Sequence, residues 1–313
     1  MSPGGGELPP VPASVVAVHD VACLDPRFRA ADDRAADADI AALHADWAER
    51  LRDEFVPANR PVVLRSVLAD WPPVEKWHDD AYLLAAAAHD ATIPARRADA
   101  SAGSTAVEGA YETDELTWAA LLDAHAEAAA HERTAAHYAA QLRLRTAMPR
   151  LFVDTNPVPE CVGALGPVWR NAPAAYFGCG HATPLHFDQL ENIFCVVRGR
   201  KRVTLWHPAD AGLLYAGEGG QAAFSRANVY APDLERFPLL ARAEARGLHV
   251  ELQAGDALYI PICWWHAIRT PVGERSISIT YHAQQPPGKA REPDGDGEWD
   301  DSEDEGPCDG GVT

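Results

Sequence analysis

The 313-residue sequence contains no uninterrupted apolar stretch long enough to cross a bilayer, because a spanning helix takes about 20 such residues. Its first residues, Met-Ser-Pro-Gly-Gly-Gly, lack the basic and apolar segments of a secretory signal. We therefore expect a protein that is intracellular, cytoplasmic or nuclear, with no membrane partner and no secretion.

The cysteines form no C-x-x-C pair and no other spacing typical of a zinc site. In a chain without a secretory signal, such cysteines are expected to be reduced and mostly buried. The pattern therefore favours neither a disulfide framework nor a cysteine metal site. The six are Cys23, Cys161, Cys179, Cys195, Cys263 and Cys308.

Basic residues are absent after Arg291, whereas ten acidic residues follow it. Without those ten, the net charge of -19 becomes -9 for residues 1–291, so about half of the charge lies in the tail. An acidic body disfavours nucleic acid as a partner, because phosphate backbones are bound by clustered Lys and Arg. A local basic patch would still allow nucleic acid to bind in spite of the acidic net charge.

Composition divides the chain into three regions. Residues 1–35 are rich in Pro, Gly, Ala and Asp without a sustained period, and we predict a disordered leader. Residues 288–313 are acidic and rich in Gly, and we predict a disordered tail. Residues 36–287 remain as a single folded domain with no internal repeat.

The first part of this domain has helical patterns around one strand. Ile40, Leu43, Trp47 and Leu51 recur at helical spacing and predict an amphipathic helix that ends before Pro57. The β-branched apolar run at 61–65 predicts a buried strand.

Two further helices are predicted from capping residues. Asp79 and Asp80 are expected to cap a helix that runs to Ala88. The segment 113–115, Thr-Asp-Glu, is expected to precede in the same way the helix that carries Trp118, Leu121 and Leu122.

From about residue 135 the pattern changes to short strands separated by turn residues. The strands are predicted near 174–177, 191–198, 201–206, 249–252, 257–260 and 276–281. Gly199-Arg200 separates two of them and predicts a hairpin. Many short strands at regular intervals indicate a sandwich or barrel. We therefore expect a mainly β fold with flanking helices, an N-terminal α/β extension, and a barrel core at about 135–285.

The segment His186-Phe187-Asp188 carries the clearest chemical signal. Residues two apart in a strand face the same way, so His186 and Asp188 would share a cavity while Phe187 packs on the other side. His266, which ends the run Ile260-Pro-Ile-Cys-Trp-Trp-His266, is the natural third ligand. Two His and one carboxylate on one face of a metal leave the other face open, which suits Fe(II).

An H-x-D triplet also recurs by chance, and either residue could be an ordinary surface or core group. The chain has 13 histidines, and among the others His181 and His207 are the main alternatives as ligands. The context favours His186, because Gly178, Gly180 and Pro184 precede it and the Trp264-Trp265-His266 segment follows.

Lys201 is a candidate for binding an anion inside the barrel. It shares a strand face with Val203 and Leu205, which are expected to point inward, whereas Arg198, Arg200 and Arg202 are assigned to solvent. An inward lysine is costly unless an anion pairs with it. A surface lysine in a basic turn is the alternative.

The stretch Thr183-Pro-Leu-His186-Phe-Asp188-Gln-Leu-Glu-Asn192, continued through Gly199-Arg-Lys201, closely resembles the JmjC oxygenases of the cupin-like group. The resemblance extends to Asn59-Arg-Pro-Val-Val-Leu-Arg65, Trp71-Pro-Pro-Val-Glu-Lys-Trp77, Ala231-Pro-Asp-Leu-Glu-Arg-Phe-Pro238, Gly255-Asp256 and Trp264-Trp-His266. It covers roughly residues 40–285.

This resemblance implies a double-stranded β-helix and an oxygenase that uses Fe(II), 2-oxoglutarate and O₂. It implies His186, Asp188 and His266 as the metal ligands. It implies Thr183 and Lys201 as partners of the distal carboxylate of 2-oxoglutarate, Asn192 near the other end, and Thr280 among the co-substrate residues. Tyr138 resembles a strand tyrosine that reaches the co-substrate or the substrate in these enzymes, and core packing is the alternative for it.

One departure from the family lies near the end of the domain. Relatives usually end this barrel strand with Asn followed by aromatic residues, whereas this chain has Thr280, Tyr281 and His282 there. The change affects the region that is expected to hold the co-substrate.

The resemblance favours hydroxylation of a protein side chain, with a protein or peptide as partner. Hydroxylation of a tRNA base is the alternative within the family. A cupin-fold binding protein without oxygenase activity, or one that uses another metal, is the alternative outside it. Neither the residues nor the resemblance specify the oligomeric state or a role for the acidic tail.

Overall fold

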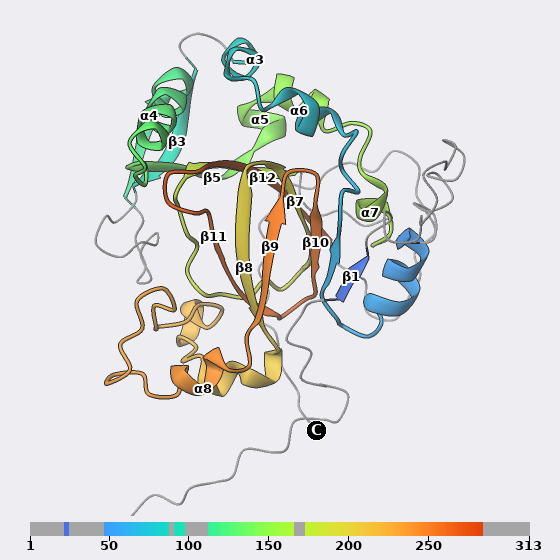
Figure 1. Cartoon of the computed structure of the whole chain (residues 1–313), viewed down its shortest axis with the longest axis vertical. Coiled ribbons are helices and arrows are strands. Elements are labelled where there is room, and N and C mark those ends of the chain that lie inside the picture. Colours follow the sequence, from blue (N-terminus) through green and yellow to red (C-terminus); the bar gives the residue numbers. More distant parts are fainter. Residues whose placement is uncertain (1–21, 25–46, 88–90, 98–111, 166–172, 284–313) are drawn as a thin grey trace, which may run out of the picture.

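A computed structural model describes residues 22–24, 47–87, 91–97, 112–165 and 173–283 (Figure 1). Three residues of the predicted leader form strand β1 (Ala22–Leu24), which pairs in parallel with β2 (Val62–Leu64). The remaining leader and the tail at 288–313 lie outside the described residues, so the division into three regions stays a prediction. Within the described ranges, no helix is long and apolar enough to cross a membrane.

Two β-sheets form the body of the domain, which confirms the expected mainly β fold class. The larger has nine strands in the order β1-β2-β10-β7-β12-β6-β5-β3-β4, and the smaller has three in the order β11-β8-β9. Apart from β1 with β2, neighbouring strands are antiparallel.

The strands after β2 are β3 (Thr92–Arg97), β4 (Thr113–Thr117), β5 (His137–Arg143), β6 (Ala174–Cys179), β7 (Glu191–Arg198), β8 (Arg200–Trp206), β9 (Leu248–Gln253), β10 (Ala257–Ile260), β11 (Trp265–Arg269) and β12 (Arg275–Ala283). The helices are η2 (Leu51–Phe55), α2 (Pro72–Lys76), α3 (Asp80–Ala85), α4 (Trp118–Ala130), α5 (Leu144–Ala147), α6 (Pro149–Asp154), α7 (Glu160–Gly163), η3 (Pro208–Leu213), η4 (Gly219–Gln221) and α8 (Leu240–Glu244). In Figure 1, α3, α5 and α6 lie at one end of the barrel and α8 at the other.

Strand β7 is buried on both faces, which explains its nearly continuous apolar sequence. Ile193, Cys195 and Val197 belong to the core that the larger sheet shares with the helices. Phe194 and Val196 point the other way, into a second core that residues of the smaller sheet complete. Because successive side chains of a strand point to opposite faces, the one strand β7 contributes residues to both cores.

Two N-terminal predictions are confirmed within the described residues. Trp47, Leu51 and Phe55 are buried on a helical segment that ends before Pro57, although the expected first turns lie outside the described residues. Strand β2 is fully buried, as its apolar run predicts.

The predicted cap of α3 is confirmed, because the Asp79 carboxylate accepts a hydrogen bond from the Ala81 N–H at 2.9 Å. The predicted cap of α4 is wrong. Residues 113–115 lie in strand β4, which pairs with β3, and the hydroxyl of Thr117 accepts from the Ala120 N–H instead. Strand β4 has no buried residue, so the apolar signal of a strand is absent there.

The predicted hairpin at Gly199 is also wrong. Strand β7 lies between β10 and β12 in the larger sheet, whereas β8 lies between β11 and β9 in the smaller one. The chain passes from one sheet to the other at Gly199, whose φ is +72°. A Cβ atom there would collide with the carbonyl oxygen of Arg275. Glycine is therefore required at a corner between sheets.

We expect Gly199→Ala to lower the free energy of unfolding by about 1–3 kcal/mol, because it combines a left-handed backbone with a steric clash. Gly212→Ala is the matched control, since Gly212 has open space around it and an ordinary φ. Urea unfolding of both variants measures the difference. Equal midpoints for the two variants would contradict the corner assignment.

Candidate metal centre

His186 and His266 face each other through their backbones. The His186 N–H donates to the His266 carbonyl at 3.1 Å, and the His266 N–H donates to the His186 carbonyl at 2.7 Å. Residues paired in this way across an antiparallel ladder carry their side chains on the same face. The two imidazole rings accordingly lie 4.2 Å apart between centroids.

The H-x-D segment lies outside the named strands, because His186 makes only isolated bridges to His266 and Phe224. The predicted alternation of its side chains nevertheless holds. Phe187 points away from the two ligand candidates and packs edge-on against Trp265, with ring centroids 4.9 Å apart. His186 and Asp188 are thus presented to the same side.

Asp188 completes a compact group of three potential ligands. Its Oδ1 lies 4.0 Å from Nε2 of His186, and its Oδ2 lies 3.6 Å from Nε2 of His266. One ligand atom from each residue lies within 4.8 Å of the other two. Two ligands that share an ion at about 2.0–2.2 Å are up to about 4 Å apart, so this spacing fits a common cation after small side-chain movements.

Backbone carbonyls fix the tautomer of both imidazoles. Nδ1 of His186 lies 2.8 Å from the Pro184 carbonyl oxygen, and Nδ1 of His266 lies 2.9 Å from that of Trp264. A carbonyl only accepts, so each Nδ1 carries a proton, and Nε2 is the nitrogen that each ring presents to a cation. Burial, and next the repulsion that a protonated His186 would exert, lower the pKa of His266 to about 4, which keeps the His266 ring neutral at pH 7.

The carboxyl of Asp188 is ionised. Burial by itself would raise its pKa, but Nε2 of His282, which faces Oδ2, and the neighbouring imidazoles of His266 and His186 hold the pKa well below its ordinary value. An anionic oxygen of Asp188 and the unprotonated Nε2 of His266 therefore converge, and Nε2 of His186 faces the same group. Such a set of acceptors is suited to a cation, and two His with one carboxylate suit Fe(II).

Lys201 is buried inside the barrel, with 2% of its surface exposed, beside Val203 and Leu205. The surface-lysine alternative is therefore wrong. Within the described part of the chain its ammonium group makes no hydrogen bond or ion pair, and it lies 6.0 Å from the ring centre of Tyr138. Burial lowers the pKa of Lys201 to about 7. A buried amine without a counter-ion favours the binding of an anion beside it.

The assignment of the neighbouring arginines to solvent is confirmed for two of the three. Arg200 and Arg202 are exposed, but Arg198 is partly buried and binds the Asp80 carboxylate at 2.6 Å. Arg198 is the last residue of β7, so the alternation along β8 that assigned its neighbours does not apply to it.

Tyr138 lies on β5 and is buried against the ring of His181, with centroids 4.8 Å apart. Thr183 is tied to the strand that carries His266, because its hydroxyl accepts from the Ile268 N–H at 3.1 Å. The hydroxyl of Thr280 contacts the Ala174 carbonyl at 3.4 Å. The predicted co-substrate role of these three residues stays a prediction.

Asn192 lies directly at the candidate metal centre. Its Nδ2 contacts Oδ2 of Asp188 at 3.4 Å, and its Oδ1 is buried without a partner in the described structure. The two histidine alternatives lie apart from the triad. His181 accepts from the Cys179 N–H, and His207 accepts from the Ala209 N–H at the start of η3.

His282 is the residue that sequence reasoning missed. Its Nε2 lies 3.5 Å from Oδ2 of Asp188. The alternation of β12 could have indicated it, since His282 follows Thr280 and Ser278 on one strand face.

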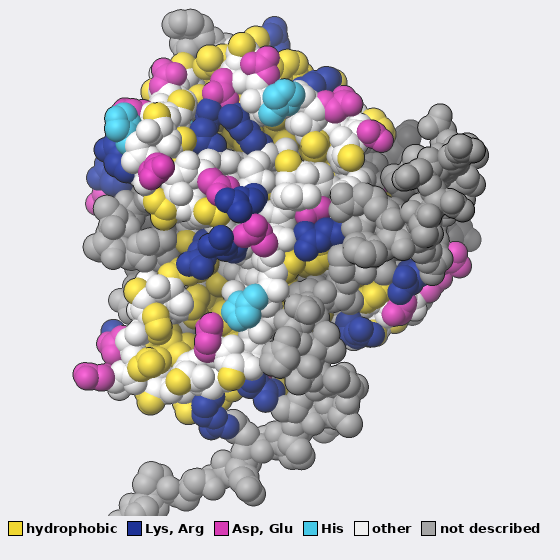
Figure 2. Space-filling model, viewed as in Figure 1, with side chains coloured by type: hydrophobic (Ala, Val, Ile, Leu, Met, Phe, Trp, Pro, Cys, Tyr) yellow, Lys and Arg dark blue, Asp and Glu magenta, His cyan; other side chains and the backbone are white. Residues whose placement is uncertain are grey.

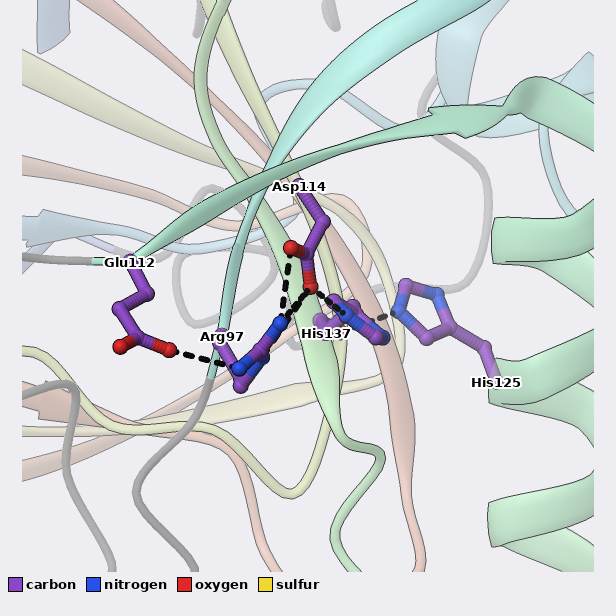
Figure 3. A network of polar contacts seen from close by, with 5 residues as sticks. All are labelled: Arg97, Glu112, Asp114, His125 and His137. Carbon is purple, nitrogen blue, oxygen red and sulfur yellow. Dashed lines mark hydrogen bonds and ion pairs between the residues drawn. The ribbon is translucent and has the colours of Figure 1, made fainter.

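A polar network holds β5 against the N-terminal strands (Figure 3). Asp114 on β4 bonds both Arg97 on β3 and Nε2 of His137 on β5, the latter at 2.8 Å. Nε2 of His125 on α4 in turn bonds the His137 carbonyl at 2.9 Å, and Arg97 also binds Glu112. Four elements are thus joined next to Tyr138.

A pocket of about 430 Å³ lies on the outer face of the smaller sheet, away from the triad. Arg202, Thr204 and Tyr230 are among its lining residues.

Figure 2 shows this face of the molecule, on which basic and acidic side chains lie side by side. Arg202 binds Glu251 at 2.8 Å, and Arg200 binds Glu251 and Glu274. These ion pairs partly neutralise the basic side chains of β8, and Arg269 on β11 lies opposite Arg202 in the same sheet.

Comparison with known proteins agrees with this geometry. The Cupin-like domain family matches residues 48–288. Jumonji C domain-containing protein 5 of Drosophila melanogaster is 30% identical over 257 residues, which cover 77% of this chain and 59% of that protein. The chain thus spans about three fifths of the length of this relative.

Two human proteins match as well. The bifunctional peptidase and (3S)-lysyl hydroxylase JMJD7 is 27% identical over 256 residues, which cover 73% of this chain and 79% of that protein. The tRNA wybutosine-synthesizing protein 5 is 39% identical over 83 residues, or 26% of this chain and 25% of that protein. The chain therefore belongs to the cupin-like domain family and is related to Jumonji C domain proteins.

Proposed function

We propose that this protein is an Fe(II)- and 2-oxoglutarate-dependent hydroxylase. The observation that carries the proposal is the buried ammonium of Lys201, which has no ion pair among the described residues, in the same barrel as the His186, Asp188 and His266 triad. The triad suits the metal, and the lysine suits an anionic co-substrate. When bound, Fe(II) and 2-oxoglutarate supply the oxidation by O₂ that hydroxylates a C–H bond.

The register of the smaller sheet supports a ligand that reaches from the triad to Lys201. His266 pairs with Leu205, and Lys201 lies four residues before Leu205 on β8. Four strand residues span about 13 Å, and the lysine side chain covers part of that length. A short dicarboxylate could therefore approach the metal with one end and Lys201 with the other.

Within this proposal, each predicted residue has a stated task. Lys201, Thr183 and Tyr138 bind the distal carboxylate of 2-oxoglutarate, and Asn192 and Thr280 lie near its other end. The apolar lining of the barrel between these groups excludes water and strengthens the ionic contact. The protein contributes placement and exclusion of competing reactions.

We propose a protein side chain as the substrate. The human relative named as a (3S)-lysyl hydroxylase matches most of both chains, whereas the tRNA-modifying relative matches about a quarter of this one. The mixed charges over β8 and β9 and the acidic body also favour a protein or peptide over a phosphate backbone. Hydroxylation of a tRNA base is the alternative that the 83-residue match supports.

We expect the purified protein with Fe(II) to release succinate from 2-oxoglutarate, and His186→Ala to reduce this release at least about 100-fold, because a metal ligand is lost. His249→Ala serves as the control, since His249 is exposed on β9. Mass spectrometry of succinate measures both. Equal release from the wild type and His186→Ala would refute the oxygenase assignment.

We expect Lys201→Met to abolish binding of 2-oxoglutarate, measured by titration calorimetry. The same variant should raise the free energy of unfolding of the ligand-free protein by about 0.5–2 kcal/mol at pH 7, because a buried unpaired amine is replaced by an apolar chain. Arg202→Met, in which an exposed neighbour is changed, should leave the affinity intact. If Lys201→Met bound 2-oxoglutarate with unchanged affinity, Lys201 would not belong to the 2-oxoglutarate site.

The pH dependence of stability provides a second check on Lys201. Its folded pKa of about 7 lies below the ordinary value of 10.5, so the unfolded chain binds more protons between these values. The wild type should therefore gain stability as pH rises from 7 to 10.5. The advantage of Lys201→Met in the free energy of unfolding should shrink over the same interval.

The substrate class is tested by incubating the enzyme, Fe(II) and 2-oxoglutarate with cell-derived peptides and, separately, with total tRNA. We expect a gain of one oxygen atom on peptides and none on nucleosides, with His186→Ala as the blank. Oxygen gained on nucleosides alone would replace our substrate with the tRNA alternative.

A further inference from the structure

The three candidate ligands are held in different ways. His186 and His266 are each fixed by a backbone carbonyl that accepts from Nδ1. The carboxylate of Asp188 receives no backbone N–H among the described residues. Its Oδ2 instead meets two side chains, Nδ2 of Asn192 at 3.4 Å and Nε2 of His282 at 3.5 Å. Its orientation therefore depends on side chains alone.

His282 and Asn192 approach the carboxylate from neighbouring strands. They are direct cross-strand partners in the pairing of β12 with β7, so both side chains point into the barrel at the same level. The side chain of His282 is 16% exposed. Its Nε2 is buried and makes no closer hydrogen bond in the described structure. The position is therefore built around the Asp188 contact.

The remaining neighbour of Oδ2 cannot take over this task. Nε2 of His266 lies 3.6 Å away, but its proton is on Nδ1, so it offers a lone pair rather than an N–H. The ring nitrogens of His282 also fall outside the group of atoms that could share an ion with the triad. His282 is thus placed to donate a hydrogen bond to the candidate ligand Asp188 and not to bind the metal itself.

We propose that His282 is a positioning residue that donates a charge-assisted hydrogen bond from Nε2 to Oδ2 of Asp188 and so orients this ligand for the metal. The present 3.5 Å is longer than the about 2.7–2.9 Å of such bonds, and a small rotation of the ring closes the difference. Hydrogen bonds that hold a metal ligand are worth about 10–100-fold in metal affinity. The inference rests on the proposed metal site but not on 2-oxoglutarate turnover.

The test measures Co(II) binding by the full-length metal-free protein through its visible absorption. His282→Leu removes the donor, and we expect it to weaken Co(II) binding about 10–100-fold. His282→Gln places an amide N–H near Nε2 and should stay within about threefold of the wild type, with the same absorption bands. Asp188→Ala should lose binding in all cases. Circular dichroism of each variant monitors folding.

Different outcomes separate the two proposals. Absence of Co(II) binding by the wild type would refute the metal site itself. Wild-type affinity in His282→Leu would overturn only the positioning role. A loss in His282→Gln equal to that in His282→Leu would also overturn it, because shape and not donation would then matter. Absorption bands that differ between wild type and His282→Gln would make His282 a ligand instead. If His282→Leu does not fold, His282→Phe carries the same comparison.

Discussion

The two reciprocal backbone hydrogen bonds between His186 and His266 are the constraint on which the site depends. They join an irregular segment to strand β11 and place two imidazoles 4.2 Å apart between ring centroids. Because the link is made by backbone, it survives substitution of neighbouring side chains. Asp188 follows two residues later and needs only an extended chain to reach the same side.

The barrel combines this constraint with an interior that is apolar except where charge is needed. Val203 and Leu205 share the inner face of β8 with Lys201, whose charged form is disfavoured by burial. A globular protein gains nothing in stability from such a lysine. The cost of this lysine in the ligand-free state supports the proposal that an anion neutralises it during function.

The sequence was sufficient for the fold class, the inward direction of Lys201 and the grouping of His186 with Asp188, because these depend on strand alternation and local spacing. It failed where tertiary context decides. Gly199 has the same local signature in a hairpin and in a corner between sheets, and only the pairing of β7 and β8 with other strands distinguishes them. Strand β4 has no buried side chain, so its polar residues resembled a helix cap.

His282 shows why the last part of a site escapes sequence reasoning. The proposed role of His282 depends on Asp188, which is 94 positions earlier in the chain. It also depends on the strand register that places His282 opposite Asn192. The same departure that brings His282 to this position also supplies a donor to the one ligand that no described backbone group holds. The other contacts of Oδ2 are Nε2 of His266, which accepts, and Nδ2 of Asn192 at a long 3.4 Å, so a further donor strengthens the hold on this carboxylate. The departure from the family pattern and the triad of His186, Asp188 and His266 are therefore compatible with one proposed metal centre.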